Sequence, residues 1–285
     1  MKKTIEFISL LSAIVGLAPL ITGIYSIIKL FKADTTNKPL YIIIFFICIS
    51  SIAGIIILYL VYTNKQKKGT AYKIEKNLDL YINGEGQSFI QNNTNKELVK
   101  HTKDSIKVLI KKGITNTLES EVYYMYLFAM LNGATNRIWA ASIMGEEEWV
   151  DTPEEEEFLR LNINASKRKV LVERIFIIEK KLVKKMLSNK LIQEQIDKRT
   201  DYFKTYIIAR EELNDHKPNL LTDIGSGFLA FDDFAVASDV FQDSFIRGIL
   251  TLDEETIKRN NRIFTNLRDF AKPLDKIVSA SLLLS

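Results

Sequence analysis

The sequence predicts an α-helical transmembrane hairpin followed by a cytosolic α/β domain, in which helices flank a mixed sheet. Three observations lead to this class. The 285-residue chain opens with two uncharged apolar runs, strand-like and helix-like segments alternate after residue 96, and helix-start signals stand between them. We expect the hairpin at 1–63, a juxtamembrane helix and linker at 64–95, and the cytosolic domain at 96–285.

The apolar runs cover Phe7–Ile28 and Leu40–Tyr62, and each has about the 20 apolar residues that a helix needs to cross a bilayer. The first run is longer than a signal-peptide core and no small-residue cleavage site closes it, so we expect a membrane span there. Small residues in both runs favour close packing of helices, either within one hairpin or in an oligomer or pore. The single cysteine, Cys48, lies in the second run and supplies neither a disulfide nor a cysteine-based metal site within one chain.

The distribution of lysines predicts how the hairpin is oriented. Three lysines lie in the loop between the runs, and six lie on the side that holds both ends of the hairpin: Lys2, Lys3, Lys65, Lys67, Lys68 and Lys73. This bias predicts a multi-pass protein of the bacterial inner membrane with both termini in the cytoplasm. We expect Lys65, Lys67 and Lys68 to contact anionic lipid head groups. Beyond residue 63, 34 Lys+Arg stand against 33 Asp+Glu, so we expect no direct binding to nucleic acid.

The soluble elements follow from periodicity and from turn and capping residues. The apolar spacing of residues 71–81 predicts a short helix that Gly84 and Gly86 end. Thr152, followed by Pro153 and Glu155, starts a helix, and we read residues 251–254 as a second capping box. The order of strand, helix and strand implies parallel pairing with right-handed crossovers. In chain order we expect helices at 97–118 and 119–131, a strand at 137–143, a helix at 153–167, a strand at 170–178, a long helix at 179–199, a strand at 202–209, a hairpin of strands at 227–231 and 235–238, and a helix to about residue 272.

This order of elements, with the segments RIWAASI at 137–143, VLVERIFII at 170–178 and DIGSGFLAFDDFAVA at 223–237, resembles a half-unit of the phospholipase D-like fold. The resemblance is to bacterial branches that serve as sensor or regulatory domains. Active members of that superfamily carry a His-x-Lys-x4-Asp motif. His216 and Asp223 have the required separation, but Pro218 stands in the place of the lysine. The resemblance therefore implies the fold without phosphodiesterase chemistry, and we expect no catalytic residue and no cofactor.

Four residues are the candidates for ligand binding: Arg137, Arg174, Asp232 and Asp233. Arg174 stands in the middle of an apolar strand, and a guanidinium binds phosphate or carboxylate with two parallel hydrogen bonds. The alternative for both arginines is a structural ion pair, and the alternative for the two aspartates is a turn. The acidic block at 146–157 is expected to be a solvated loop and helix start, with a hard-cation site as the alternative. We expect no metal site.

The combination predicts a membrane-anchored sensor–effector. Its cytosolic domain would bind a small anionic molecule or a protein encoded in the same operon, and association of the hairpins into a homo-oligomer would then disturb the membrane. The arrangement is similar to two-span effectors of bacterial anti-phage defence by abortive infection. Two alternatives stay open: a diverged membrane-bound phosphodiesterase of the phospholipase D type, and a passive membrane-tethered scaffold for a partner protein.

Overall fold

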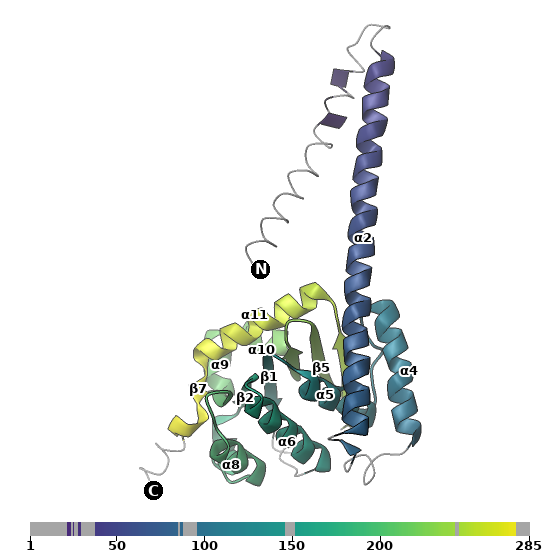
Figure 1. Cartoon of the computed structure of the whole chain (residues 1–285). Coiled ribbons are helices and arrows are strands. Elements are labelled where there is room, and N and C mark those ends of the chain that lie inside the picture. The colour runs from purple at the N-terminus through teal and green to yellow at the C-terminus, as the bar shows by residue number, and fades with distance from the viewer. Residues whose placement is uncertain are drawn as a thin grey trace. The chain divides into compact units, whose positions relative to one another are not determined.

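The computed structural model describes residues 22–23, 25, 28–29, 38–84, 86–87, 96–145, 152–242 and 245–277 (Figure 1). The chain divides into two compact units, Met1–Gln66 and Lys67–Ser285. Most of the first expected span, 7–28, the acidic loop 146–151 and most of the linker between Gly84 and Lys96 lie outside the described residues.

The second apolar run lies in helix α2 (Lys38–Asn83), which has 46 residues. Its segment Tyr41–Tyr62 is long and apolar enough to cross a membrane, and it is the one such helix among the described residues. The two-helix hairpin therefore stays a prediction. The juxtamembrane helix expected after residue 64 is the C-terminal part of α2 and not a separate element, and it ends at Asn83, before Gly84, as the sequence predicts.

In the second unit, α4 (Lys96–Lys112) and α5 (Ser120–Gly133) follow. We expected one helix as far as Leu118, and this is wrong because Gly113 adopts a φ of 75° and ends α4. The next residues instead extend alongside a strand, where Ile114 faces Thr251 and Leu118 faces Gly248 in isolated bridges.

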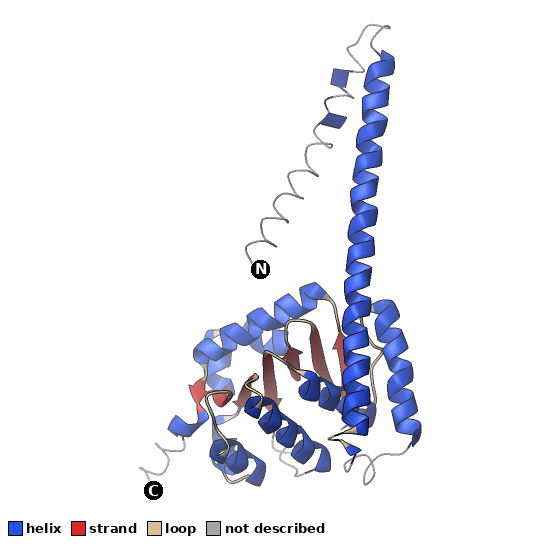
Figure 2. Ribbon diagram, viewed as in Figure 1, coloured by secondary structure: helices blue, strands red, loops and turns tan. Residues whose placement is uncertain are grey.

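Seven strands form one mixed sheet in the order β6-β5-β4-β1-β2-β3-β7. Figure 2 shows strands of this sheet in red, with helices in blue around them. The three strands β1, β2 and β3 pair in parallel, and β4 and β5 form an antiparallel hairpin, as the sequence predicts. The two edge strands, β6 and β7, are not among the strands that the sequence predicts. The bounds are β1 (Arg137–Met144), β2 (Leu171–Ile178), β3 (Phe203–Ala209), β4 (Gly227–Phe231), β5 (Ala235–Gln242), β6 (Phe245–Thr251) and β7 (Lys272–Pro273).

Helices cover both faces of the sheet. On one face, α5 packs on β6, α6 (Pro153–Lys167) packs on β2 and β3, and α8 (Lys190–Asp197) packs on α6. On the other face, α11 (Glu254–Phe270) crosses β1, β3, β4 and β5, next to α9 (Arg210–His216) and α10 (Pro218–Ile224). Each layer has its own hydrophobic core, which centres on Phe128 on the first face and on Trp139 and Phe264 on the second.

Local capping corrects two expectations. The long helix expected at 179–199 is divided into η1 (Lys180–Leu182), α7 (Val183–Leu187) and α8, because the Asn189 side chain accepts a hydrogen bond from the Ile192 N–H and starts a new helix. Thr152 caps α6, as predicted. The cap of α11 is Asp253, which accepts from the Thr256 N–H at 2.9 Å, and not Thr251.

The last turns of α2 pack on α5. Ile74, Leu78 and Tyr81 are fully buried, and the Tyr81 ring lies 5.7 Å from the Phe128 ring. The side chain of Asn77 lies directly over Gly133, so that a Cβ at position 133 would lie 1.8 Å from the Asn77 Nδ2. The two helices therefore touch where one of them has no side chain.

Candidate functional site

A cavity of about 140 Å³ lies between the first face of the sheet and the layer formed by α5, α6 and α8. Its sheet side is built from β1, β2, β4 and β5, and the central strands contribute the small residues Ala140 and Ser142. An engineered apolar cavity of about 150 Å³ is known to hold benzene, so this space suits a small molecule.

Arg174 is the cation of this cavity. It lies on β2, opposite Ala140 of β1, and its Nη1 donates to the Gln195 Oε1 of α8 at 3.1 Å. The guanidinium carbon lies 5.0 Å from the ring centroid of Phe158 and 4.9 Å from that of Phe176. The Arg174 Nε is buried and has no hydrogen-bond partner in the part of the chain that the structure describes. Burial lowers the pKa of Arg174 to about 10, and Glu155 acts in the opposite direction.

The environment of Arg174 is suited to an anion. A buried donor without a partner is unfavourable, and a carboxylate or phosphate oxygen would satisfy it with a charge-assisted hydrogen bond. The pKa of about 10 keeps the guanidinium protonated at neutral pH. The two phenyl rings make cation–π contacts with the guanidinium, and these contacts restrict the orientation of the Arg174 side chain.

Asp239, on β5, lines the same cavity. The Tyr123 hydroxyl donates to its Oδ1 at 2.7 Å, and the Ser226 hydroxyl donates to its backbone oxygen at 2.6 Å. Burial raises the pKa of the Asp239 carboxyl, although the hydrogen bond from Tyr123 opposes this. A Cβ at position 227 would lie 2.7 Å from the Asp239 Oδ2, so glycine at 227 leaves room for the carboxyl.

The neighbour of Arg174 in sequence faces the opposite layer. Glu173 is buried, and it accepts hydrogen bonds from the Trp139 Nε1 at 2.9 Å, the Tyr206 hydroxyl at 3.2 Å and Arg268 at 3.4 Å. The Trp139 ring stacks on Phe264 at 4.7 Å. This acid is therefore satisfied within the fold and offers nothing to a ligand.

Arg137 lies on the Glu173 face of the sheet, because it is separated from Trp139 by two positions on β1. Its guanidinium is paired with Asp233 and lies 3.7 Å from the Trp139 ring centroid. Asp233 also accepts from the Asn261 Nδ2 at 2.8 Å. The structure thus places Arg137 and Arg174 on opposite faces, and it does not bring together the two arginines that the sequence suggested for one ligand.

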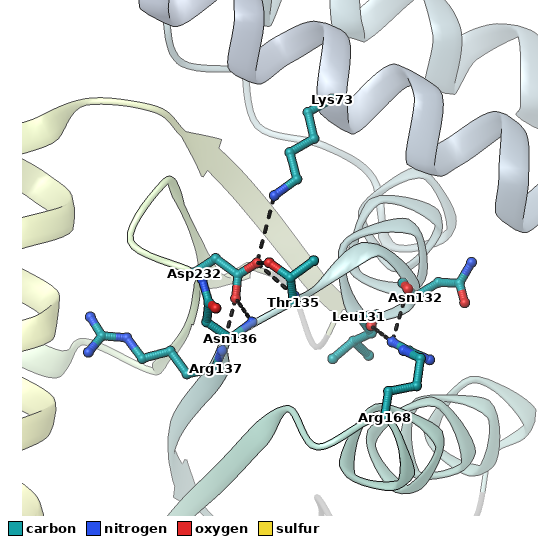
Figure 3. A network of polar contacts seen from close by, with 8 residues as sticks. All are labelled: Lys73, Leu131, Asn132, Thr135, Asn136, Arg137, Arg168 and Asp232. Carbon is teal, nitrogen blue, oxygen red and sulfur yellow. Dashed lines mark hydrogen bonds and ion pairs between the residues drawn. The ribbon is translucent and has the colours of Figure 1, made fainter. Parts of the chain in front are cut away.

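Asp232 anchors a turn (Figure 3). Asp232 and Asp233 both adopt positive φ, at 47° and 65°, in the turn between β4 and β5. The Asp232 carboxylate accepts from the backbone N–H groups of Thr135, Asn136 and Arg137 and from the Thr135 hydroxyl, all at 2.8–2.9 Å. Burial disfavours its charge, but these donors outweigh burial and lower the pKa of Asp232.

Lys73 of α2 reaches the same turn. Its ammonium lies 3.7 Å from the Asp232 Oδ2 and 4.3 Å from the ring centroid of Phe234. Nearby, the Arg168 guanidinium donates to the backbone oxygens of Leu131 and Asn132 at the end of α5 (Figure 3). Through these contacts Asp232 connects α2, the β4–β5 turn and the start of β1, which is a structural role.

The remaining sequence candidates lie apart from the cavity. His216 is exposed at the end of α9, and Asp223 is paired with Arg259 at 2.7 Å. Lys65 is exposed on α2, whereas the side chains of Lys67 and Lys68 are not among those that the structure describes. Among the described residues, no group of three or more His, Cys, Asp or Glu is placed to hold a metal ion.

Sequence reasoning missed several lining residues of the cavity. Glu155 belongs to the acidic block that the sequence analysis expects to be solvated, and Gln195 lies within the range of the long helix expected at 179–199. Asp239 is not among the four candidates for ligand binding. A usable signal was its position on β5, because Ala235, Ala237 and Asp239 share one face of that strand and the two alanines are buried.

No family model matches the sequence, and no curated protein matches it. Among solved structures, the chain is similar to TrmBL2, an archaeal chromatin protein described as binding DNA, with 13% identity, a TM-score of 0.36, and coverage of 62% of this chain. The chain spans about 61% of the length of that protein.

Two further solved structures are also similar. Nuc from Salmonella typhimurium, a phospholipase D family member, has 8% identity and a TM-score of 0.35 over 52% of this chain and 87% of its own. NucT from Helicobacter pylori has 13% identity and a TM-score of 0.39 over 56% of this chain and 96% of its own. Our proposals rest on the side chains of the cavity.

Proposed function

We propose that this chain is a membrane-anchored sensor whose second unit binds a small anionic ligand in the cavity at Arg174. The observation that carries the proposal is the Arg174 side chain beside an open space. Its buried Nε has no hydrogen-bond partner among the described residues, and its guanidinium carbon lies 5.0 Å and 4.9 Å from the ring centroids of Phe158 and Phe176. We propose binding without bond cleavage, with Arg174 as the group that holds the anion.

Helix α6 supports a route from the cavity to α2. Glu155 and Phe158 of α6 line the cavity, and Glu157 lies between them in sequence. Glu157 is buried and accepts from the Tyr81 hydroxyl of α2 at 2.7 Å, while the Arg160 Nε donates to it at 2.6 Å. A ligand that moves α6 would therefore change a buried hydrogen bond of the helix that carries the apolar segment Tyr41–Tyr62.

The response that we propose is membrane disruption by association of the N-terminal apolar helices, in bacterial defence against phage. The supporting features are the apolar segment of α2 and its covalent continuity with the Tyr81 contact. Anchoring in the inner membrane with both termini in the cytoplasm is part of the same proposal. His216 is exposed and lies outside the cavity lining, so we do not favour the diverged phosphodiesterase.

Expression in bacteria tests this function. The full chain should appear in the membrane fraction and should depolarise cells under phage challenge or overexpression, as a voltage-sensitive dye reports. A chain without residues 1–63 and the Arg174→Met variant should leave the potential unchanged. Arg262→Met is the matched control, because Arg262 is an exposed arginine of α11 outside the cavity lining, and it should depolarise like the parent. A full chain that is soluble without detergent, or that never depolarises cells, contradicts the proposal.

A further inference from the structure

The charges that line the cavity do not suit a ligand that is only anionic. Three ionisable side chains with a formal charge at neutral pH line it: Arg174, Glu155 and Asp239. One cation thus stands with two carboxyl groups. The carboxyl groups of Glu155 and Asp239 repel a ligand whose only charge is negative, and a positively charged group elsewhere on the ligand would offset that repulsion.

Both carboxyl groups belong to the same electrostatic environment. Burial raises the pKa of Tyr124, and Glu155 and then Asp239 raise it further. Tyr124 itself lines the cavity, and Glu155 also acts on Arg174. The cavity is therefore one space in which the charges of Arg174, Glu155 and Asp239 act on neighbouring side chains.

The sheet separates the two ends. Arg174 lies on β2 and Asp239 on β5, with β1 and β4 between them, so their backbones are three strand spacings apart, or about 14 Å. Both side chains face the same layer, because Arg174 is in register with Ala140 and Asp239 is next to Gly227, which pairs with Ser142. The long arginine side chain shortens the distance that a ligand must span.

The lining between the ends is mostly apolar or small, with Leu127, Leu159 and Leu229 beside Ala140 and Ser142. The volume of about 140 Å³ is well below the roughly 300–1,000 Å³ of pockets that hold drug-sized ligands. These observations favour a short molecule with polar ends and an apolar middle, and they disfavour a nucleotide.

From this arrangement we propose that the ligand is a small amphoteric molecule, with a carboxylate or similar anionic group at Arg174 and an amino group, or another nitrogen donor, at the carboxyl of Asp239. The inference rests on the proposed sensor function and specifies its ligand. The anionic end would satisfy the buried Nε of Arg174, and the amino end would donate to Asp239 and to the hydroxyl oxygen of Ser226.

Three matched probes test the charge pattern: 6-aminohexanoate has both ends, hexanoate has only the anion, and hexylamine has only the cation. Titration calorimetry on the full chain in amphipol measures the dissociation constant of each. We expect 6-aminohexanoate to bind at least about tenfold more tightly than either single-ended probe, which corresponds to about 1.4 kcal/mol.

Two variants assign the ends. Asp239→Asn keeps an acceptor for the Tyr123 hydroxyl but removes the negative charge, so it should lower the affinity for 6-aminohexanoate and leave or raise that for hexanoate. Arg174→Met should remove binding of both carboxylates. Asp201→Asn and Arg262→Met, at exposed positions outside the cavity lining, are the controls and should bind like the parent. Near-parental unfolding temperatures exclude misfolding as the cause of a loss.

The outcomes separate this inference from the sensor proposal. If hexanoate binds as tightly as 6-aminohexanoate and both depend on Arg174, the amphoteric ligand is wrong and the anion sensor stands. If Asp239→Asn leaves the preference for 6-aminohexanoate unchanged, the assignment of the amino end is wrong. If no probe shows binding that depends on Arg174, both proposals fail.

Discussion

Glu173 and Arg174 are neighbours on one strand, yet the two faces of the sheet treat them differently. On the α11 face, Glu173 is enclosed by Trp139, Tyr206 and Arg268, and its charge is satisfied inside the fold. On the α6 face, Arg174 donates to the Gln195 side chain, its one side-chain acceptor in the described part of the chain, and an open space lies beside it. A charge that the fold satisfies stabilises the structure, whereas a charge that it leaves partly unsatisfied is available to a ligand.

Removal of the satisfied charge should have the largest effect. Glu173→Leu leaves the buried Trp139 Nε1 without its acceptor and separates Arg268 from its carboxylate, so we expect a loss of about 3 kcal/mol in the free energy of unfolding. Urea unfolding of the full chain in micelles, followed by circular dichroism, measures it. The control Glu255→Leu, at a side chain that is 85% exposed, should change stability by less than about 0.5 kcal/mol. Equal losses of free energy of unfolding in Glu173→Leu and Glu255→Leu would contradict the structural role of Glu173.

A methyl group on the cavity face should have the next largest effect. Gly227→Ala places a Cβ 2.7 Å from the Asp239 Oδ2 and 3.0 Å from the Ala141 oxygen, and we expect a loss of about 2 kcal/mol from overpacking. Gly69→Ala is the matched control, because its Cβ meets no atom within 4 Å and alanine favours a helix. The same unfolding experiment should show Gly69→Ala at or above parental stability, and a Gly227→Ala protein of parental stability would contradict the close contact.

The unsatisfied charge should matter little for stability. Arg174→Met removes a charge whose one side-chain hydrogen bond among the described residues is to Gln195, and the apolar replacement can contact the same two rings. We expect the free energy of unfolding to change by less than about 1 kcal/mol. A loss as large as that of Glu173→Leu would show that both charges serve the fold, and the comparison between the two faces would then be wrong.

The smallest expected effect is a change in the pH dependence of stability, which also distinguishes the two faces of the sheet. The pKa of Asp239 is raised by burial, so the stability that its carboxyl confers is present below its unfolded value of 3.8 and is lost as pH rises through the raised pKa. Asp239→Asn should therefore gain stability relative to the parent as pH rises from 3.5 to 7. Thermal unfolding at a series of pH values measures this, and a constant difference would contradict the burial of Asp239.

Asp232 should show the opposite sign. Its backbone donors outweigh burial and lower its pKa, so its stabilisation is present above 3.8 and is lost as pH falls through the lowered pKa. Asp232→Asn should thus be destabilised most at neutral pH and least in acid, in the same thermal series. Parallel pH curves for the two asparagine variants would contradict the different environments of these aspartates.

The sequence predicted the parts of the fold that depend on local pattern. The strands β1 to β5 and the cap at Thr152 follow from alternation and from residue types with specific roles, and the structure confirms them. The cavity depends on which residues meet across the sheet and the helix layer. Alternation places Glu173 and Arg174 on opposite faces but does not tell which face α11 fills. The contacts of Arg174 with Gln195 and Phe158 join residues far apart in the chain, which one sequence does not reveal.

The contact between Asn77 and Gly133 constrains how related chains diverge. Since a Cβ at 133 would overlap the Asn77 amide, any larger residue there requires a shorter one at 77. We therefore expect these two positions to change together among homologues. A homologue in which only the glycine is replaced should lose the packing of α2 on α5. An alignment, once assembled, would show this as covariation of a pair that is 56 positions apart in the chain.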